Sequence, residues 1–219
     1  MTREAGRDDV VTVAHPERGP LAMACKRGIQ ALALLWVSPR LIAYSLARGL
    51  WGEDRAFLAA SESISRIPGM RGVYCRQAFY RRTLERCGRD VYFGWHSVFS
   101  MPRARVGEGV YIGRRCSVGY ADLESEVMLA DGVQILSGGR EHGRSAGAEE
   151  THRDQPQEYR RVTIHRGAWL GTNAVIMADV GAGAIVGAGA VVTKPVPARS
   201  VAVGVPAAVV KTLEGTSRR

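Results

Sequence analysis

Aliphatic or aromatic residues recur at intervals of six through most of the chain after residue 90. They fall in groups with a spacing of six inside each group: Phe93 and Phe99; Val106, Ile112 and Val118; Leu129 and Ile135; Ile164, Leu170 and Ile176; Val180, Val186 and Val192. This period fits neither an amphipathic helix, which repeats after about 3.6 residues, nor a two-faced strand, which repeats after about two. Regular repetition indicates a repeat architecture, and the repeat therefore decides the fold.

Small residues accompany the repeated positions at two places. Glycine often follows directly, as at Gly107, Gly113 and Gly171, and the fourth residue after the repeated position is usually small, as at Ala174 and Ala190. Six residues can form one flat side of a triangular coil, with the aliphatic side chain inside and glycine where a Cβ would crowd the corner. Stacked coils would pair as parallel strands, so the predicted fold class is mainly β, a parallel β-helix.

Changes in residue pattern divide the chain into four parts. Residues 1–20 mix charges, Gly and Pro without periodicity and are predicted to be a mobile leader. Apolar residues recur at steps of three and four in residues 21–90, which predicts a helical region. Residues 91–200 are predicted to form the β-helix domain, with an inserted loop at 138–161 where the six-residue spacing stops. Residues 201–219 follow as a C-terminal tail.

The predicted helical region is both apolar and basic. Residues 21–90 contain twelve Lys or Arg against five Asp or Glu, in a chain whose net charge is +9. The apolar run "IQALALLWVSPRLIAYSLARGL" is interrupted by Pro39, Arg40 and Arg48, and a spanning helix needs about 20 mostly apolar residues in succession. It lies behind a charged N-terminal stretch, which disfavours a signal peptide. We expect two short helices that meet at Pro39.

Two interpretations of residues 21–90 remain open. The region is either a helical subdomain whose arginines face water, or a peripheral patch that contacts an anionic membrane. Nucleic acid is not an expected partner, because the chain carries no recognisable reader motif.

The cysteines indicate a reduced, cytoplasmic protein. Cys25, Cys75, Cys87 and Cys116 lie far apart and form no C-x-x-C pair, which excludes a zinc knuckle or a dithiol redox motif built on that spacing. Cys116 occupies one of the small inward positions, so we expect it to fill the core.

The repeats over residues 91 to 212 resemble those of the hexapeptide-repeat acyltransferases. The resemblance rests also on "AWLGTNAVIMADVGAGAIVGAGAVVTKPVP" and on the tail "SVAVGVPAAVVK". It implies a left-handed β-helix, against the usual right-handed crossover preference, and a homotrimer that binds acetyl-CoA between neighbouring prisms. It further implies that a histidine acts as general base and that the acetyl group passes directly to the acceptor.

Residues 57–90 are similar to the helical leader of the branch that acetylates surface polysaccharides and their precursors. The function implied is an acetyl-CoA-dependent O-acetyltransferase that acts on a sugar of a surface polysaccharide or lipid-linked glycan precursor. We expect it in the cytoplasm, at the inner face of the cell membrane.

The inserted loop supplies the candidate base. Its segment "SGGREHG" resembles the family element "SG…QHG", which assigns the role to His142. A neutral imidazole accepts protons near pH 7, and a placed base contributes about 10²–10⁴ in rate. Arg140 stands where many relatives carry a second histidine, and His152 and His165 remain alternatives. Glu141 either orients the imidazole or is solvated.

The resemblance also implies four residues along the acetyl-CoA groove: Thr172, Ala188, Thr193 and Lys194. Backbone amides at small-residue corners can bond the pantetheine arm, and Lys194 can meet a CoA phosphate. Trp169 is a candidate wall of the groove. No metal is expected.

Other functions stay open at this point. A serine acetyltransferase or an N-acetyltransferase of an amino sugar would use the same base, and a trimeric scaffold would only present the inserted loop. A metal-dependent hydratase of the carbonic anhydrase type is disfavoured, because no two histidines lie four to six residues apart.

Overall fold

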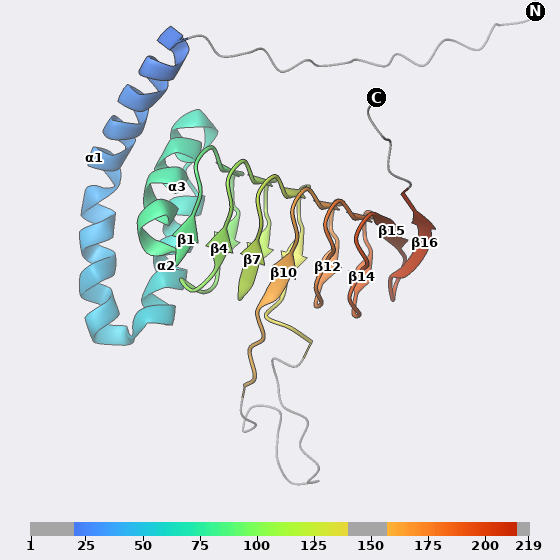
Figure 1. Ribbon diagram of the computed structural model, residues 1–219. Helices are drawn as coiled ribbons and strands as arrows, with labels where there is room; N and C mark the ends of the chain where they lie inside the picture. Colours follow the sequence, from blue (N-terminus) through green and yellow to red (C-terminus); the bar gives the residue numbers. More distant parts are fainter. Residues whose placement is uncertain (1–19, 140–156, 214–219) are drawn as a thin grey trace, which may run out of the picture.

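The computed structural model describes residues 20–139 and 157–213, with side chains from residue 28 onward. Three helices precede a stack of coils: α1 (Pro20–Trp51), α2 (Glu53–Ser65) and α3 (Gly69–Thr83) (Figure 1). The predicted leader, apart from Pro20, lies outside the described residues, as do 140–156 of the inserted loop and the last six residues, 214–219.

Short strands follow the helices. They are β1 (Arg86–Cys87), β2 (Tyr92–Phe93), β3 (Val98–Phe99), β4 (Arg105–Val106), β5 (Tyr111–Ile112), β6 (Ser117–Val118), β7 (Ala121–Leu123), β8 (Met128–Leu129), β9 (Gln134–Ile135), β10 (Val162–Ile164), β11 (Trp169–Leu170), β12 (Val175–Ile176), β13 (Ile185–Val186), β14 (Val191–Val192), β15 (Ser200–Val203) and β16 (Ala208–Thr212). The first strand therefore begins before residue 91, and β15 and β16 fall largely within the predicted tail.

The strands form three sheets that the chain visits in turn. Sheet A has the order β1-β4-β7-β10, sheet B has β2-β5-β8-β11-β13-β15-β16, and sheet C has β3-β6-β9-β12-β14. Neighbouring strands are parallel except β15 and β16, and isolated bridges from Ile164 to Val180 and on to Val196 continue sheet A. The predicted fold class is confirmed: a left-handed parallel β-helix of about five turns, preceded by a helical region.

The interior of the prism is filled by the repeated residues. All the aliphatic and aromatic positions at the six-residue spacing have exposed fractions of 1% or less. The small positions four residues later, among them Cys116, Ala174 and Ala190, are buried as well. Each coil thus places one large and one small side chain per face inside the prism, which is how a narrow core reaches close packing.

The corners bring successive coils into backbone contact. A Cβ on Gly94 would lie 2.1 Å from the carbonyl oxygen of Gly113, and one on Gly171 would lie 2.5 Å from the amide nitrogen of Ala188. These two glycines are required by close approach, since such separations are below any real Cβ contact.

The expectation of two short helices meeting at Pro39 is wrong, because α1 continues through Pro39 to Trp51. Pro39 lies on the exposed side of the helix. Val37 and Tyr44, on either side of it along the chain, are both buried. Packing of that face keeps the two halves in one helix despite the missing N–H group of proline. The break comes instead at Gly52, whose φ of 84° only glycine adopts readily.

The helices close the first end of the prism and share its core. The ring of Tyr80 on α3 lies 4.8 Å from that of Phe93 and 5.0 Å from that of Phe99, between ring centroids. Ser61 on α2 accepts a hydrogen bond from the Phe99 amide at 2.9 Å, and its hydroxyl lies 2.8 Å from the Tyr80 hydroxyl. Burial raises the pKa of Tyr80 to about 12, so this buried network stays neutral at physiological pH.

Arg76 on α3 binds the same junction through backbone carbonyls. Its Nε donates to the carbonyl oxygen of Phe93 at 3.0 Å, and its guanidinium also reaches the carbonyls of Ser65 and Ile67 at 3.3 and 2.8 Å. Only 1% of the residue is exposed, and burial lowers its pKa. Three carbonyl dipoles solvate the buried charge in place of water.

Candidate functional site

The four predicted cofactor residues lie on two different edges of the prism. Thr172 follows β11 and Ala188 follows β13, so both stand at the corner between sheets B and C, where Gly189 donates to the Thr172 carbonyl at 2.8 Å. Thr193 and Lys194 follow β14, at the corner between sheets C and A. All four are exposed. One chain therefore does not bring them together.

The inserted loop leaves and rejoins the prism at the edge between sheets C and A. Its two ends are tied to each other, because the amide of Arg160 donates to the carbonyl of Ser137 at 2.7 Å. Asp179 holds the returning strand: its carboxylate pairs with Arg160 at 2.8 Å and accepts the Thr163 amide at 2.9 Å. The Asp179 carbonyl also accepts the amide of Val196 at 2.9 Å. The base of the loop is thereby fixed two coils away from Thr193 and Lys194, with the corner that holds Asp179 between them.

His142, His152, Arg140 and Glu141 lie outside the described residues. The structure thus gives only the edge at which the described ends of the loop meet the prism, and the assignment of the base to His142 stays a prediction.

A groove of about 380 Å³ runs over sheet B beside the corner that holds Thr172. It is lined by Tyr111, Met128, Leu129, Ala130, Asp131, Trp169 and Thr172. Trp169 and Met128 are about half exposed, at 48% and 50%. Asp131 closes the polar end, where its carboxylate accepts hydrogen bonds from the backbone and guanidinium of Arg114, and these bonds lower the pKa of Asp131. The groove combines an apolar wall, peptide corners and a fixed ion pair.

Trp169, the candidate wall named from the sequence, lines this groove, but the other apolar residues on the outside of sheet B were missed from the sequence. The residue just before each inward position points outward, and the register on this face runs Tyr92, Tyr111, Met128, Trp169 and Ile185. The corresponding column on sheet A is polar, with Arg86, Arg105, Asp122 and Thr163. The sequence did contain a signal for this surface. The outward positions that recur once per full coil are mostly apolar on sheet B and polar on sheet A.

His165 is the one predicted alternative base that the structure describes. It lies at the corner between sheets A and B, where its Nδ1 is 3.0 Å from the carboxylate of Glu124. The amide of Arg166 donates to the same carboxylate at 2.8 Å. The pKa of Glu124 is lowered by the Arg166 amide first and by the imidazole second. A carboxylate on Nδ1 orients an imidazole and sets its tautomer, so His165 has the partner that a general base uses.

The corner that holds His165 is separate from the two corners that hold the predicted cofactor residues. The neighbouring groove, of about 550 Å³, is lined by Arg86, Gly88, Val106, Gly107, Glu108, Asp122, Glu124, Ser125 and Arg166. Its lining mixes cationic and anionic groups and includes none of the predicted cofactor residues. The side chain of His165 is 43% exposed, which is also what a solvated histidine at a corner would show.

Among the residues that the structure describes, the thiols and carboxylates do not form a metal site. Within residues 28–139 and 157–213, no group of three or more His, Cys, Asp or Glu could hold a metal ion. Cys75, Cys87 and Cys116 are free. Burial raises the pKa of the Cys116 thiol and takes that of Cys87 to about 11, so both remain protonated near pH 7 and Cys116 fills the core.

The known proteins to which the chain is similar are acetyltransferases. No family model matches it. Serine acetyltransferase 2 of Arabidopsis thaliana is 30% identical over 205 residues, which make up 92% of this chain and 50% of that protein. The serine acetyltransferase of Bacillus pumilus is 29% identical over 177 residues, 74% of this chain and 72% of that one. The chain therefore spans about half the length of the plant relative.

Two solved structures share the fold. A maltose O-acetyltransferase from Clostridium difficile superposes with a TM-score of 0.65 at 23% identity, over 74% of this chain and 88% of the other. A galactoside acetyltransferase in complex with coenzyme A gives a TM-score of 0.63 at 20% identity, over 74% of this chain and 82% of the other. At these identities the likeness is one of fold.

Proposed function

We propose that this chain, a left-handed parallel β-helix, is a hexapeptide-repeat acyltransferase that transfers an acetyl group from acetyl-CoA to a sugar hydroxyl. The acceptor we favour belongs to a surface polysaccharide or a lipid-linked glycan precursor, and the reaction takes place in the cytoplasm. Support for a sugar comes from the solved structures, one named for maltose and the other for a galactoside. The observation that carries the proposal is the groove beside Thr172 in a β-helix shared with a protein crystallised with coenzyme A.

The groove suits the arm of a CoA thioester. A pantetheine arm alternates amides with methylene groups, so it can lie along Trp169 and Met128 while it bonds to peptide groups at the Thr172 and Ala188 corners. Arg114 is already paired with Asp131, so the anionic nucleotide of CoA requires a different cation. Lys194, exposed at the next edge, is the residue we assign to that phosphate.

A homotrimer would unite the two edges. Thr172 and Ala188 of one prism would face Thr193 and Lys194 of the next copy, and the described ends of the inserted loop lie at the second of these edges. The exposed apolar column of sheet B, with Trp169 and Met128 at its centre, offers the surface that neighbouring copies would bury. Measuring the molar mass in solution by light scattering tests this arrangement, and a monomer would contradict it.

In the reaction we assign the proton to His142. As the acceptor oxygen attacks the thioester carbonyl, its proton passes to the imidazole, and a C–O bond forms. The C–S bond then breaks, and the imidazolium returns the proton to the departing CoA thiolate. Acetyl moves from sulfur to oxygen in one transfer, so neither an acyl-enzyme nor a metal is needed.

Serine is a second candidate acceptor, because both relatives described above are named serine acetyltransferases. An amino sugar is a third, since an amine would use the same base. One assay separates them: release of CoA thiol from acetyl-CoA, followed with a chromogenic thiol reagent, in the presence of an oligosaccharide, an amino sugar or serine. A turnover number that is highest with serine would replace the sugar proposal.

Binding of the donor is tested before turnover. Coenzyme A that binds only the folded protein raises the melting temperature, by mass action. We expect stabilisation by saturating CoA and none by free adenine. An unchanged melting temperature at millimolar CoA would contradict the enzyme proposal and favour a scaffold that presents the inserted loop.

A further inference from the structure

The outer side of α1 is apolar along its whole described length. In Figure 1, α1 lies at the margin of the molecule, with α2 and α3 between it and the first coil. Ala33, Val37 and Tyr44 are buried on its inner side. The large residues on the opposite side are Leu32, Leu35, Ile42, Leu46 and Leu50, which are exposed by 69%, 71%, 62%, 67% and 75%. We call these five residues the apolar stripe.

The apolar stripe follows the helical repeat. Its members are three, four or seven to eight residues apart, and Leu32 and Leu50 are separated by about 27 Å at 1.5 Å per residue. A surface helix in water normally carries polar or charged residues on this side. Contiguous apolar surface of such extent marks an interaction site. The stripe therefore requires a partner.

The charge around the apolar stripe has one sign. The 32 residues of α1 include no Asp or Glu, and residues 28–83 carry eight arginines against three acidic residues. Arg71 lies over the ring of Trp36, 5.9 Å from its centroid, beside the stripe. An apolar surface flanked by cationic groups is complementary to a layer of anionic phosphates over hydrocarbon.

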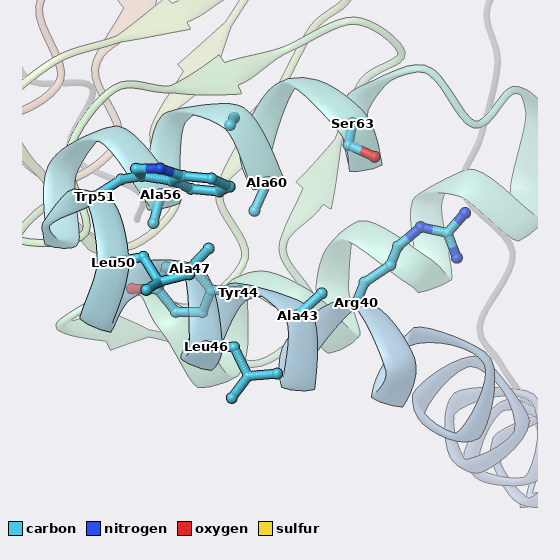
Figure 2. Close-up of a pocket in the computed structure, with 11 residues that line it drawn as sticks. Arg40, Ala43, Tyr44, Leu46, Ala47, Leu50, Trp51, Ala56, Ala60 and Ser63 are labelled. Atoms are coloured by element: carbon cyan, nitrogen blue, oxygen red, sulfur yellow. The ribbon is translucent and has the colours of Figure 1, made fainter.

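A groove between α1 and α2 widens the apolar surface, as Figure 2 shows. It measures about 450 Å³ and is lined by Arg40, Ala43, Tyr44, Leu46, Ala47, Leu50, Trp51, Ala56, Ala59, Ala60 and Ser63. Leu46 and Leu50 belong both to this groove and to the apolar stripe, so the two surfaces are continuous. Arg40 and Ser63 supply polar groups to a groove that is otherwise formed of apolar side chains and the Tyr44 ring.

Two other partners fit less well. By length and composition Gly28–Trp51 could cross a membrane, but Tyr44 packs its ring 6.2 Å from Phe57 of α2 and 6.1 Å from Phe79 of α3. Lipid therefore cannot surround the helix while these contacts last. A second copy of the chain would bring two surfaces of the same positive sign together, which electrostatic repulsion opposes.

We propose that α1 lies flat in the interface of an anionic bilayer, with the apolar stripe at the boundary between acyl chains and headgroups. Arg40 and Arg71 pair with lipid phosphates, and Trp36 and Trp51, exposed by 48% and 66%, lie at headgroup depth. The inner side of α1 keeps its contacts with α2 and α3. This attachment does not depend on the acetyl-transfer activity.

Co-sedimentation of the full chain with vesicles tests the proposal. We expect binding to vesicles of phosphatidylcholine mixed with phosphatidylglycerol, weaker binding to phosphatidylcholine alone, and weakening by salt. The double variant Leu35→Glu and Leu46→Glu, at two highly exposed positions, should lower partitioning about tenfold or more. The double variant Val209→Glu and Val210→Glu is the matched control: these residues are 47% and 62% exposed on β16, at the opposite end of the prism, and the variant should bind like the unmodified chain.

Circular dichroism and CoA-dependent melting establish that each variant is folded. Retained vesicle binding by the double variant, or equal binding of the unmodified chain to neutral and anionic vesicles, would overturn the proposal. So would a double variant that changes the molar mass of the protein without vesicles, since the stripe would then join copies of this chain. Loss of vesicle binding with normal thiol release on a soluble acceptor separates this proposal from the proposed function.

Discussion

Gly94 and Gly171 lie where one coil of the prism crosses directly over the next. A single Cβ at either position would enter the backbone of the neighbouring coil. The coil spacing is set by the hydrogen bonds between stacked strands, so it cannot expand at one corner without breaking bonds in the adjoining sheets. These glycines therefore act through steric exclusion, and the effect of replacing them depends on the space at each position.

Replacing Gly94 with Ala should lower the free energy of unfolding by about 3 kcal/mol, at the upper end of the range for overpacked positions. Gly49→Ala is the control, because nothing lies within 4 Å of a Cβ at that position in α1. There the change should stabilise the protein by about 0.5–1 kcal/mol, since alanine favours helix. Urea denaturation measures both, and equal effects of the two changes would refute the steric explanation.

The choice of base rests on two histidines. We expect His142→Ala to lower kcat by about 10²–10⁴ and to leave stabilisation by CoA intact, because it would remove only the proton acceptor. His165→Ala should keep near-normal turnover, although it breaks the contact with Glu124. Initial rates of thiol release measure both. The opposite pattern would move the base to His165, with Glu124 as the residue that orients it.

At the scale of elements, α3 joins the helices to the prism. It contributes Tyr80 to the aromatic core and Arg76 to the carbonyls at the end of α2 and on β2. These contacts cross the boundary between helical and β structure, so we expect the two parts to unfold together as one cooperative unit.

Arg76→Met should destabilise the protein by about 3 kcal/mol, because it removes charged hydrogen bonds and leaves buried carbonyls without that donor. Arg81→Met, on the same helix and only partly buried, should change stability by less than about 0.5 kcal/mol. Chemical denaturation is followed by circular dichroism for the helices and, with Trp36→Phe and Trp51→Phe introduced to remove the tryptophans of α1, by the fluorescence of Trp95 and Trp169 for the prism. Separate transitions in that background would refute the shared unit.

At the scale of the whole molecule, carboxylates stabilise the outside of the prism by pairing between coils. Asp131 accepts hydrogen bonds from Arg114, Glu124 from the Arg166 amide, and Glu85 from Arg105. The pKa of each carboxyl is lowered by these contacts in the folded state. Each pair is exposed or partly exposed, so its individual contribution is small.

The pH dependence follows from the direction of these shifts. A carboxyl with a lowered folded pKa contributes its stability above its unfolded pKa of about 4, and that contribution is lost as the pH falls through the folded pKa. We expect the melting temperature to change little from pH 7 to 5 on their account and to fall below about pH 4. Asp131→Asn should reduce the slope of that fall, and an unchanged slope would show that this carboxyl takes no part.

The residues predicted to fill the interior are buried in the structure. This prediction succeeded because the direction in which a side chain points is a local property of an extended backbone. Phe93, Val106 and Leu170 point inward wherever the coils lie, since burial of the alternating side is the only way to cover their surface. The prediction of a break at Pro39 failed for the opposite reason. Whether a proline ends a helix depends on what its flanks pack against, and Tyr44 is held by rings from α2 and α3.

The sequence by itself thus determined the repeat, the inward residues, the corner glycines and the place of the inserted loop, all of which depend on neighbours within about six positions. Only the tertiary structure decided which edges the predicted cofactor residues occupy. For example, the inward residues Ile176 and Val180 are only four residues apart, instead of six, at the corner between sheets C and A. The bridges from Val180 to Ile164 and to Val196 fix the position of this shorter corner. Stacking against coils distant in sequence also separated Thr172 from Lys194 and left one side of α1 without cover. These arrangements arise from contacts between distant segments, which no local pattern encodes.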